Sequence, residues 1–133
     1  MTEPVLYTAS VPVFLHYLDR IAAILARIDV TPEVLAHRLA PDMAPASAQF
    51  STAINFSLRI CLKLAGKRVS GVPQVDASRE VLADWLQLAR AKLAALKPEQ
   101  FVQAEGRVIQ HRAGVAFLEQ SPHDFLHLFG LPN

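Results

Sequence analysis

The sequence predicts a mainly α-helical protein, an antiparallel four-helix bundle with a small β-hairpin before a shortened last helix. Three long segments carry apolar residues at the three- and four-residue spacing of an amphipathic helix. Two short runs rich in Val, Ile and Phe interrupt this pattern, and a brief fourth helical segment follows them. Because each apolar stripe must be buried against another, the helices are expected to pack side by side.

The first long helix is predicted over residues 10–29, starting at Ser10. Its stripe consists of Phe14, Leu18, Ile21, Leu25 and Ile28. A short helix follows, because Thr31 can cap orphan N–H groups and Pro32 fits the first helical position. This short helix is expected to end before Pro41.

The second long helix is predicted to follow Asp42 and to stop at Gly66, a typical C-terminal glycine. It is broadly apolar, which favours a central position. Its stripe consists of Phe50, Ile54, Ser57, Cys61 and Leu64.

A loop containing Gly71 and Pro73 leads to the third long helix. Either Asp76 or Ser78 is expected to cap this helix. Its stripe consists of Leu82, Leu86, Ala89, Leu93 and Leu96.

Residues 107–118 predict a hairpin in which Gly114 supplies a positive φ at the turn, although a buried helical turn is an alternative. Ser121 is then expected to cap the fourth helix, with Pro122 in its first position. That helix has room for about two turns before Gly130.

Composition restricts the class of protein. The 133 residues fit one domain, residues 1–133, and 13 Lys and Arg against 12 Asp and Glu give a net charge of +1. The basic residues are spread along the chain, which argues against nucleic acid as a partner. No apolar run reaches the length of a membrane span, and no export signal is expected at the N-terminus. The single cysteine, Cys61, predicts a reducing compartment, the cytoplasm.

Four short stretches resemble a known family: YTASVPVF (7–14), LAHRLAPDM (35–43), LAG (64–66) and FGLPN (129–133). They are similar to a bacterial family of unknown function within the DinB-like helical bundles, a superfamily of metalloenzymes. The resemblance implies a four-helix bundle. It also implies a divalent metal held by three histidines, one from the second helix and two from the last.

The metal ligands do not carry over to this sequence. The second-helix histidine corresponds to Asn55 or Phe56, and the last-helix histidine that the resemblance implies lies beyond Asn133. His123 and His127, four residues apart, share one helical face but are only weak candidates, because zinc needs a third protein ligand. The apolar residues around them, Phe125, Leu126, Leu128 and Phe129, are expected to face the core and to leave both histidines on a polar face. No metal site is therefore predicted.

Three residues are candidates for a ligand pocket. Asn55 is the polar side chain set among the apolar faces of the second helix, so a buried hydrogen bond or a pocket contact is expected. Phe56 is expected to be largely buried where an imidazole and an ion would lie, and Trp85 could line a pocket. Aromatic residues at helical spacing are more often plain core. His111 shows no acidic or nucleophilic partner in the sequence.

Two functions remain open. The first is a non-catalytic module that binds a small molecule or another copy of itself, with no cofactor. The second is a metal-dependent enzyme, a hydrolase or a thiol-group transferase using nickel or zinc, which rests on superfamily analogy. A short last helix is expected to expose a groove lined by Leu18, Ile54 and Leu86. A symmetric homodimer would close this groove, unless the natural chain continues past Asn133.

Overall fold

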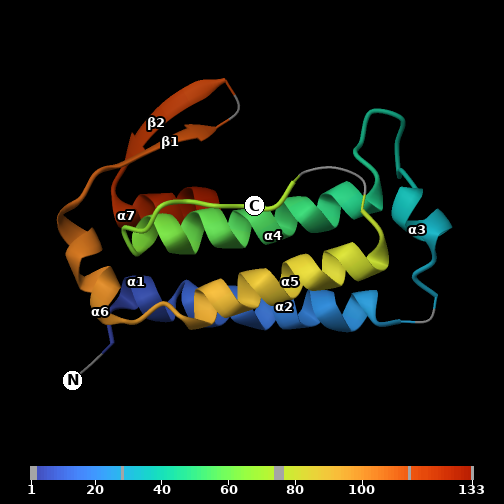
Figure 1. The fold of residues 1–133 in the computed structure, drawn as a ribbon. Helices are drawn as coiled ribbons and strands as arrows, with labels where there is room; N and C mark the ends of the chain where they lie inside the picture. The colour runs from blue at the N-terminus through green and yellow to red at the C-terminus, as the bar shows by residue number, and fades with distance from the viewer. Residues whose placement is uncertain (1–2, 28, 74–76, 114, 133) are drawn as a thin grey trace.

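The computed structural model describes residues 3–27, 29–73, 77–113 and 115–132. Three long helices run side by side: α2 (Val11–Leu25), α4 (Ala46–Leu64) and α5 (Arg79–Ala94) (Figure 1). The short helices α1 (Val5–Thr8) and α6 (Glu99–Val102) lie at one end, next to the 3-10 turn η1 (Gln103–Gly106). The short helix α3 (Pro32–Ala36) lies at the other end. The prediction of a mainly helical protein is confirmed.

Local signals set several helix ends as the sequence predicts. Two ends differ from the prediction: α2 stops at Leu25 rather than at residue 29, and α4 begins at Ala46, after Pro45, rather than directly after Asp42. The hydroxyl of Thr31 accepts a hydrogen bond from the Val34 N–H at the start of α3. Ser78 caps α5 in the same way, while the alternative cap, Asp76, lies outside the described residues. Gly66 follows α4 with φ 73°, a left-handed conformation that favours glycine.

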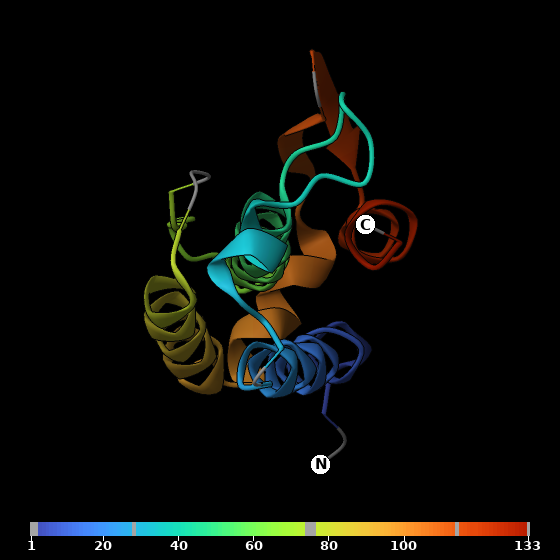
Figure 2. The same ribbon diagram turned by 90° about the vertical axis from the view of Figure 1, so that its right-hand side faces the viewer.

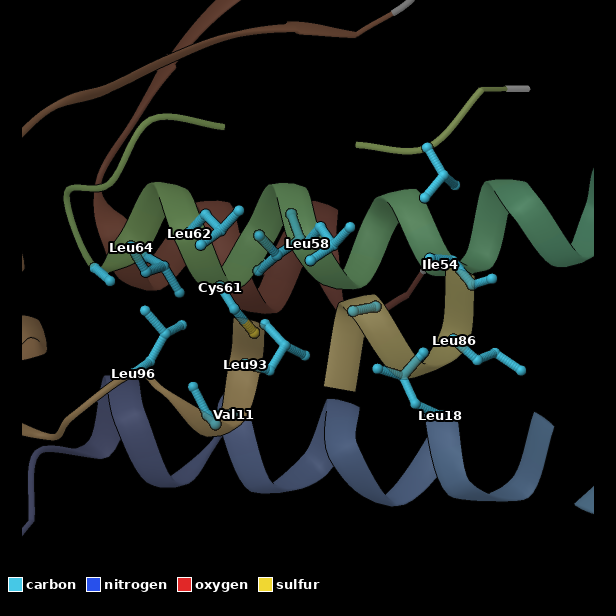
Figure 3. Close-up of a cluster of buried hydrophobic side chains, with 14 of the residues drawn as sticks. Val11, Leu18, Ile54, Leu58, Cys61, Leu62, Leu64, Leu86, Leu93 and Leu96 are labelled. Atoms are coloured by element: carbon cyan, nitrogen blue, oxygen red, sulfur yellow. The ribbon is translucent and has the colours of Figure 1, made fainter. Parts of the chain in front are cut away.

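Most residues of the predicted stripes belong to one hydrophobic core cluster (Figure 3), and Phe14, Ile21 and Phe50 pack against it. Ile28, also predicted for the first stripe, lies outside the described residues. Leu18, Ile54 and Leu86 lie within the cluster, with exposures of 1%, 0% and 2%. The prediction that these residues line one open groove is therefore wrong for Ile54 and Leu86, whereas Leu18 also borders a hollow described below. Helices α2, α4 and α5 contact one another directly and bury these side chains without a fourth helix.

The predicted hairpin is confirmed. Strands β1 (Ile109–Ala113) and β2 (Ala116–Gln120) form an antiparallel pair in which His111 lies opposite Leu118. The turn residue Gly114, for which a positive φ is predicted, lies outside the described residues. The hairpin projects from the α4 side of the helical body (Figure 1).

The last helical segment begins with α7 (Pro122–Asp124), where the Ser121 hydroxyl accepts from the Asp124 N–H as predicted. It continues as a π-helical turn, η2 (Phe125–Gly130), beside α4 (Figure 2). Gly130 allows this approach, since a Cβ there would lie 2.9 Å from Cγ1 of Ile60. Contrary to prediction, Leu128 faces away from the core and is exposed.

Within the described ranges, the helices are too short or too polar to cross a bilayer.

Candidate functional site

The three predicted pocket residues point to different places. Asn55 contacts the connection between α4 and α5, whereas Phe56 lies half-buried between α2 and the end of η2. Phe56 is therefore less buried than predicted. Trp85, on α5, packs against the core cluster and borders none of the cavities described below. The three residues do not form one site.

Asn55 makes the hydrogen bonds that its position predicts. Its Nδ2 donates to the carbonyl oxygen of Val72 at 2.8 Å, and its Oδ1 accepts from the Val72 N–H at 2.7 Å. Gly71 permits this approach, because a Cβ there would lie 2.5 Å from the Asn55 Oδ1. The Asn55 amide thus holds the α4–α5 connection against α4.

An apolar hollow of about 680 Å³ lies between α2, α4 and the chain that joins α3 to α4. We call it, together with its continuation described next, the α2–α4 groove. Three polar residues, Glu33, His37 and Gln49, also border the hollow. Its large apolar lining residues are Ile21, Val34, Leu39, Met43 and Phe50.

The groove continues toward the C-terminal segment. A second hollow of about 230 Å³ shares Ile21 and Ala53 with the first, and is bordered by Phe56, Gly130 and Leu131. The groove therefore runs along α2 and α4 from the point where η2 ends. A short last segment does leave an apolar groove, and of the residues predicted to line it, Leu18 borders the second hollow while Ile54 and Leu86 border neither hollow.

His123 and His127 do not form a metal centre by themselves. Their rings are nearly parallel, with centroids 6.3 Å apart. His123 is half-buried and His127 exposed. In the part of the chain that the structure describes, no group of three His, Cys, Asp or Glu side chains could hold a metal ion. These residues do not fit the three-ligand set that the DinB-like superfamily implies.

His111 has partners that the sequence did not reveal. It is buried, with 3% exposure, and its Nε2 lies 2.6 Å from Oε1 of Gln120. Its Nδ1 lies 3.3 Å from Nη2 of Arg59 on α4. Gln120 offers an oxygen and Arg59 offers only donors, so the ring hydrogen belongs on Nε2. The rings of Phe125 and Phe129 enclose the imidazole, with centroids 4.7 Å and 4.4 Å away.

Arg59 links α4 to the hairpin. Its Nη2 also donates to the carbonyl oxygen of Arg112, and its guanidinium lies over the Phe129 ring, 5.1 Å from the centroid. Burial lowers the pKa of Arg59. Burial and the nearby Arg59 charge also lower the pKa of Lys63, one turn further along α4. The ion pairs found among the described residues involve neither cation.

Cys61 is not suited to nucleophilic chemistry. It lies in the core between the long helices (Figure 3), and burial raises the pKa of its thiol. The thiolate, which is the reactive form, is therefore disfavoured.

The fold and the groove define a mainly helical protein with an open apolar groove on its surface. Residues 6–133 match the family described as a domain of unknown function, DUF1993, and the chain belongs to this family. No curated protein matches the chain.

Proposed function

We propose that this protein is a non-catalytic module that binds a small, elongated apolar molecule in the α2–α4 groove. The main hollow, at about 680 Å³, is the observation that carries this proposal. It falls within the roughly 300–1,000 Å³ of small-molecule sites, which are mostly apolar with a few polar groups. Ile21, Phe50 and Met43 supply apolar walls from α2, α4 and the α3–α4 connection.

The shape of the groove favours a small molecule as its occupant, rather than the flat surface of another protein. The walls of the main hollow come from α2, α3, the α3–α4 connection and α4, which enclose it between them. Glu33, His37 and Gln49 border the main hollow, where they can hydrogen-bond a polar group of the ligand. The narrower continuation toward Phe56 suits an apolar tail.

The test uses N-phenyl-1-naphthylamine, a neutral apolar dye whose fluorescence rises in apolar surroundings. We expect saturable binding, competed by dodecanol. Leu39→Glu puts a charge in the lining at a position that is 83% exposed, so folding should survive. Affinity should fall about tenfold or more, because a charge opposes apolar contact. Phe50→Ala should also weaken binding, whereas Leu88→Glu, an exposed apolar position on α5 outside the groove, should not.

Two other occupants are distinguishable outcomes. A second copy would give a dimer by light scattering, as the sequence predicts, and Leu39→Glu would dissociate it. Dye that binds only when the dimer is broken would assign the groove to self-association and overturn the small-molecule proposal. Additional chain after Asn133, if the natural gene product has it, would compete for the same surface. Loss of dye binding in that longer product would also overturn the proposal.

We further propose that the architecture is a DinB-like four-helix bundle with a reduced last helix. The position of α7 and η2 beside α4 supports this, as do the resembling stretches in the sequence. Cytoplasmic location in a bacterium remains part of the proposal and rests on the lone Cys61 and the family resemblance.

The alternative function is a metal-dependent enzyme, a hydrolase or a thiol-group transferase. His123 and His127 are the residues from which such a site would have to be built. Metal analysis after incubation with nickel or zinc and dialysis separates the two functions. Stoichiometric metal that is lost in the doubly substituted protein His123→Ala, His127→Ala would favour the enzyme.

A further inference from the structure

A second hollow, of about 590 Å³, lies on another face of α4 and differs from the groove in its chemistry. It is bordered by Asn55 and Arg59 on α4, and by residues 69–73 of the α4–α5 connection. Three polar residues are among those that border it: Asn55, Arg59 and Ser70. We call it the Arg59 hollow.

The Arg59 hollow offers unused hydrogen-bond donors. Arg59 uses its Nη2 for the bonds to His111 and Arg112, and within the described residues its Nε and Nη1 have no acceptor. The Ser70 Oγ accepts from Nζ of Lys92 at 2.5 Å, so the hydroxyl hydrogen is left to donate elsewhere. The Asn55 Nδ2 donates to Val72 and carries a second hydrogen.

The charged side chain that borders the hollow, among the described residues, is a cation, and two further cations lie nearby. Arg59 borders the hollow, and Lys63 follows it one turn later on α4. Lys92, on α5, donates a hydrogen bond to Ser70, which also borders the hollow. Of the residues seen to border this hollow, none is Asp or Glu. Burial disfavours the charged form of Arg59, and no carboxylate in the described ranges pairs with it to offset that cost. An anion in the hollow would supply the missing partner.

We propose that the Arg59 hollow binds a small oxyanion, the carboxylate or phosphate group of a small molecule. A guanidinium presents donors in a planar fork that matches either group, and the Ser70 hydroxyl adds a donor from the facing loop. The Asn55–Val72 pair holds that loop in place, so the donors are positioned before the anion arrives. This site is separate from the α2–α4 groove and stands without it.

Arg59 also has a structural role, because it joins α4 to the hairpin. A structural role alone predicts that its removal loosens the hairpin and that added anions have no effect. Ser70→Ala keeps these roles apart, since the side-chain hydrogen bond seen for Ser70 in the described ranges joins it to Lys92 on α5 and not to the hairpin.

The experiment titrates ¹⁵N-labelled protein with sodium phosphate and, separately, with sodium acetate, both at ionic strength fixed with sodium chloride. We expect saturable shifts of the Ser70 and Gly71 amide signals. Arg59→Gln should weaken binding about tenfold, the size of a charged hydrogen bond, and Ser70→Ala severalfold. The control Arg20→Gln removes an exposed cation on α2 and should leave the affinity unchanged.

The two probes identify the source of the oxyanion. Saturation by phosphate alone assigns a phosphate group, saturation by acetate alone assigns a carboxylate, and saturation by both assigns the shared chemistry. Amide shifts that fail to saturate with either salt would overturn the proposal. So would affinity unchanged in Ser70→Ala, the variant that decides the matter if Arg59→Gln does not fold.

Discussion

Asn55 pairs with both backbone groups of Val72 because a side-chain amide carries a donor and an acceptor side by side. Val72 is buried, so replacing Asn55 by Leu would leave an N–H and a carbonyl without partners. We expect Asn55→Leu to lower the free energy of unfolding by about 2–4 kcal/mol, measured by urea denaturation. The exposed amide Gln87 on α5 is the control, and Gln87→Ala should change it by less than about 0.5 kcal/mol. Equal small losses would show that the Asn55–Val72 pair does not stabilise the fold.

The buried thiol of Cys61 makes the free energy of unfolding depend on pH in the alkaline range. Burial raises its pKa above the ordinary value of 9.0, so above that pH the unfolded chain loses the proton while the folded chain keeps it. The folded state then binds more protons, and the free energy of unfolding falls by about 1.4 kcal/mol per pH unit from this group. Chemical denaturation between pH 8 and 11 should show this slope in the wild type relative to Cys61→Ala. Parallel pH profiles would contradict the buried thiol.

At this scale, the sequence predicts what local chemistry determines. Thr31, Ser78 and Ser121 cap helices as predicted, because a cap bonds a backbone group only three residues away. The environment of His111 was missed, because its partner Arg59 is 52 residues away. Only the tertiary fold brings His111 and Arg59 together, and a pattern of residue spacing cannot predict such a contact.

At the scale of elements, one face of the C-terminal helical segment packs against the rest of the protein and the other face is exposed. Phe125, in η2, is fully buried against His111 and the core, whereas Leu128, three residues later, is 68% exposed. Phe125→Ala should therefore cost about 3–5 kcal/mol, the usual loss for a buried phenylalanine. Leu128→Ala should cost less than about 0.5 kcal/mol. Thermal or urea unfolding of the two variants checks this, and similar losses would mean that the segment packs differently.

The histidines of the same segment are expected to matter little for stability. His127 is exposed and His123 half-buried on the rim of the segment. His123→Ala and His127→Ala should each shift the midpoint of thermal unfolding only slightly. Stabilisation of the wild type by added zinc, lost in both variants, would instead show a metal bound by the pair.

The presence and order of the main elements were more predictable than their exact ends or their packing. The three long helices, the hairpin and the start of the last helical segment all follow from residue spacing and capping residues. The short pieces α1, α6 and η1 were missed, because about one turn is too short to show a period. The groove lining was predicted only in part for a related reason: Leu18 borders it, but a stripe shows that Ile54 is buried without showing which neighbouring helix buries it.

At the scale of the whole molecule, one core cluster joins elements from both ends of the chain. It includes Leu6 of α1 and Leu126 of η2, and Trp85 on α5 packs against it. Because the three long helices share this cluster, none of them can detach or unfold without exposing apolar surface on the other two. Unfolding is therefore expected to be a single cooperative transition, as in most domains of this size.

Trp85 is the only tryptophan, so its fluorescence reports on α5, while far-UV circular dichroism reports on all helices. We expect the two urea transitions to have the same midpoint and slope. Phe125→Ala should shift both by the same amount, although Phe125 lies in the C-terminal segment and Trp85 in α5. If the circular dichroism of Phe125→Ala changed at low urea while its Trp85 transition stayed at the wild-type midpoint, the C-terminal segment would unfold on its own. Residues 1–133 would then not behave as one domain.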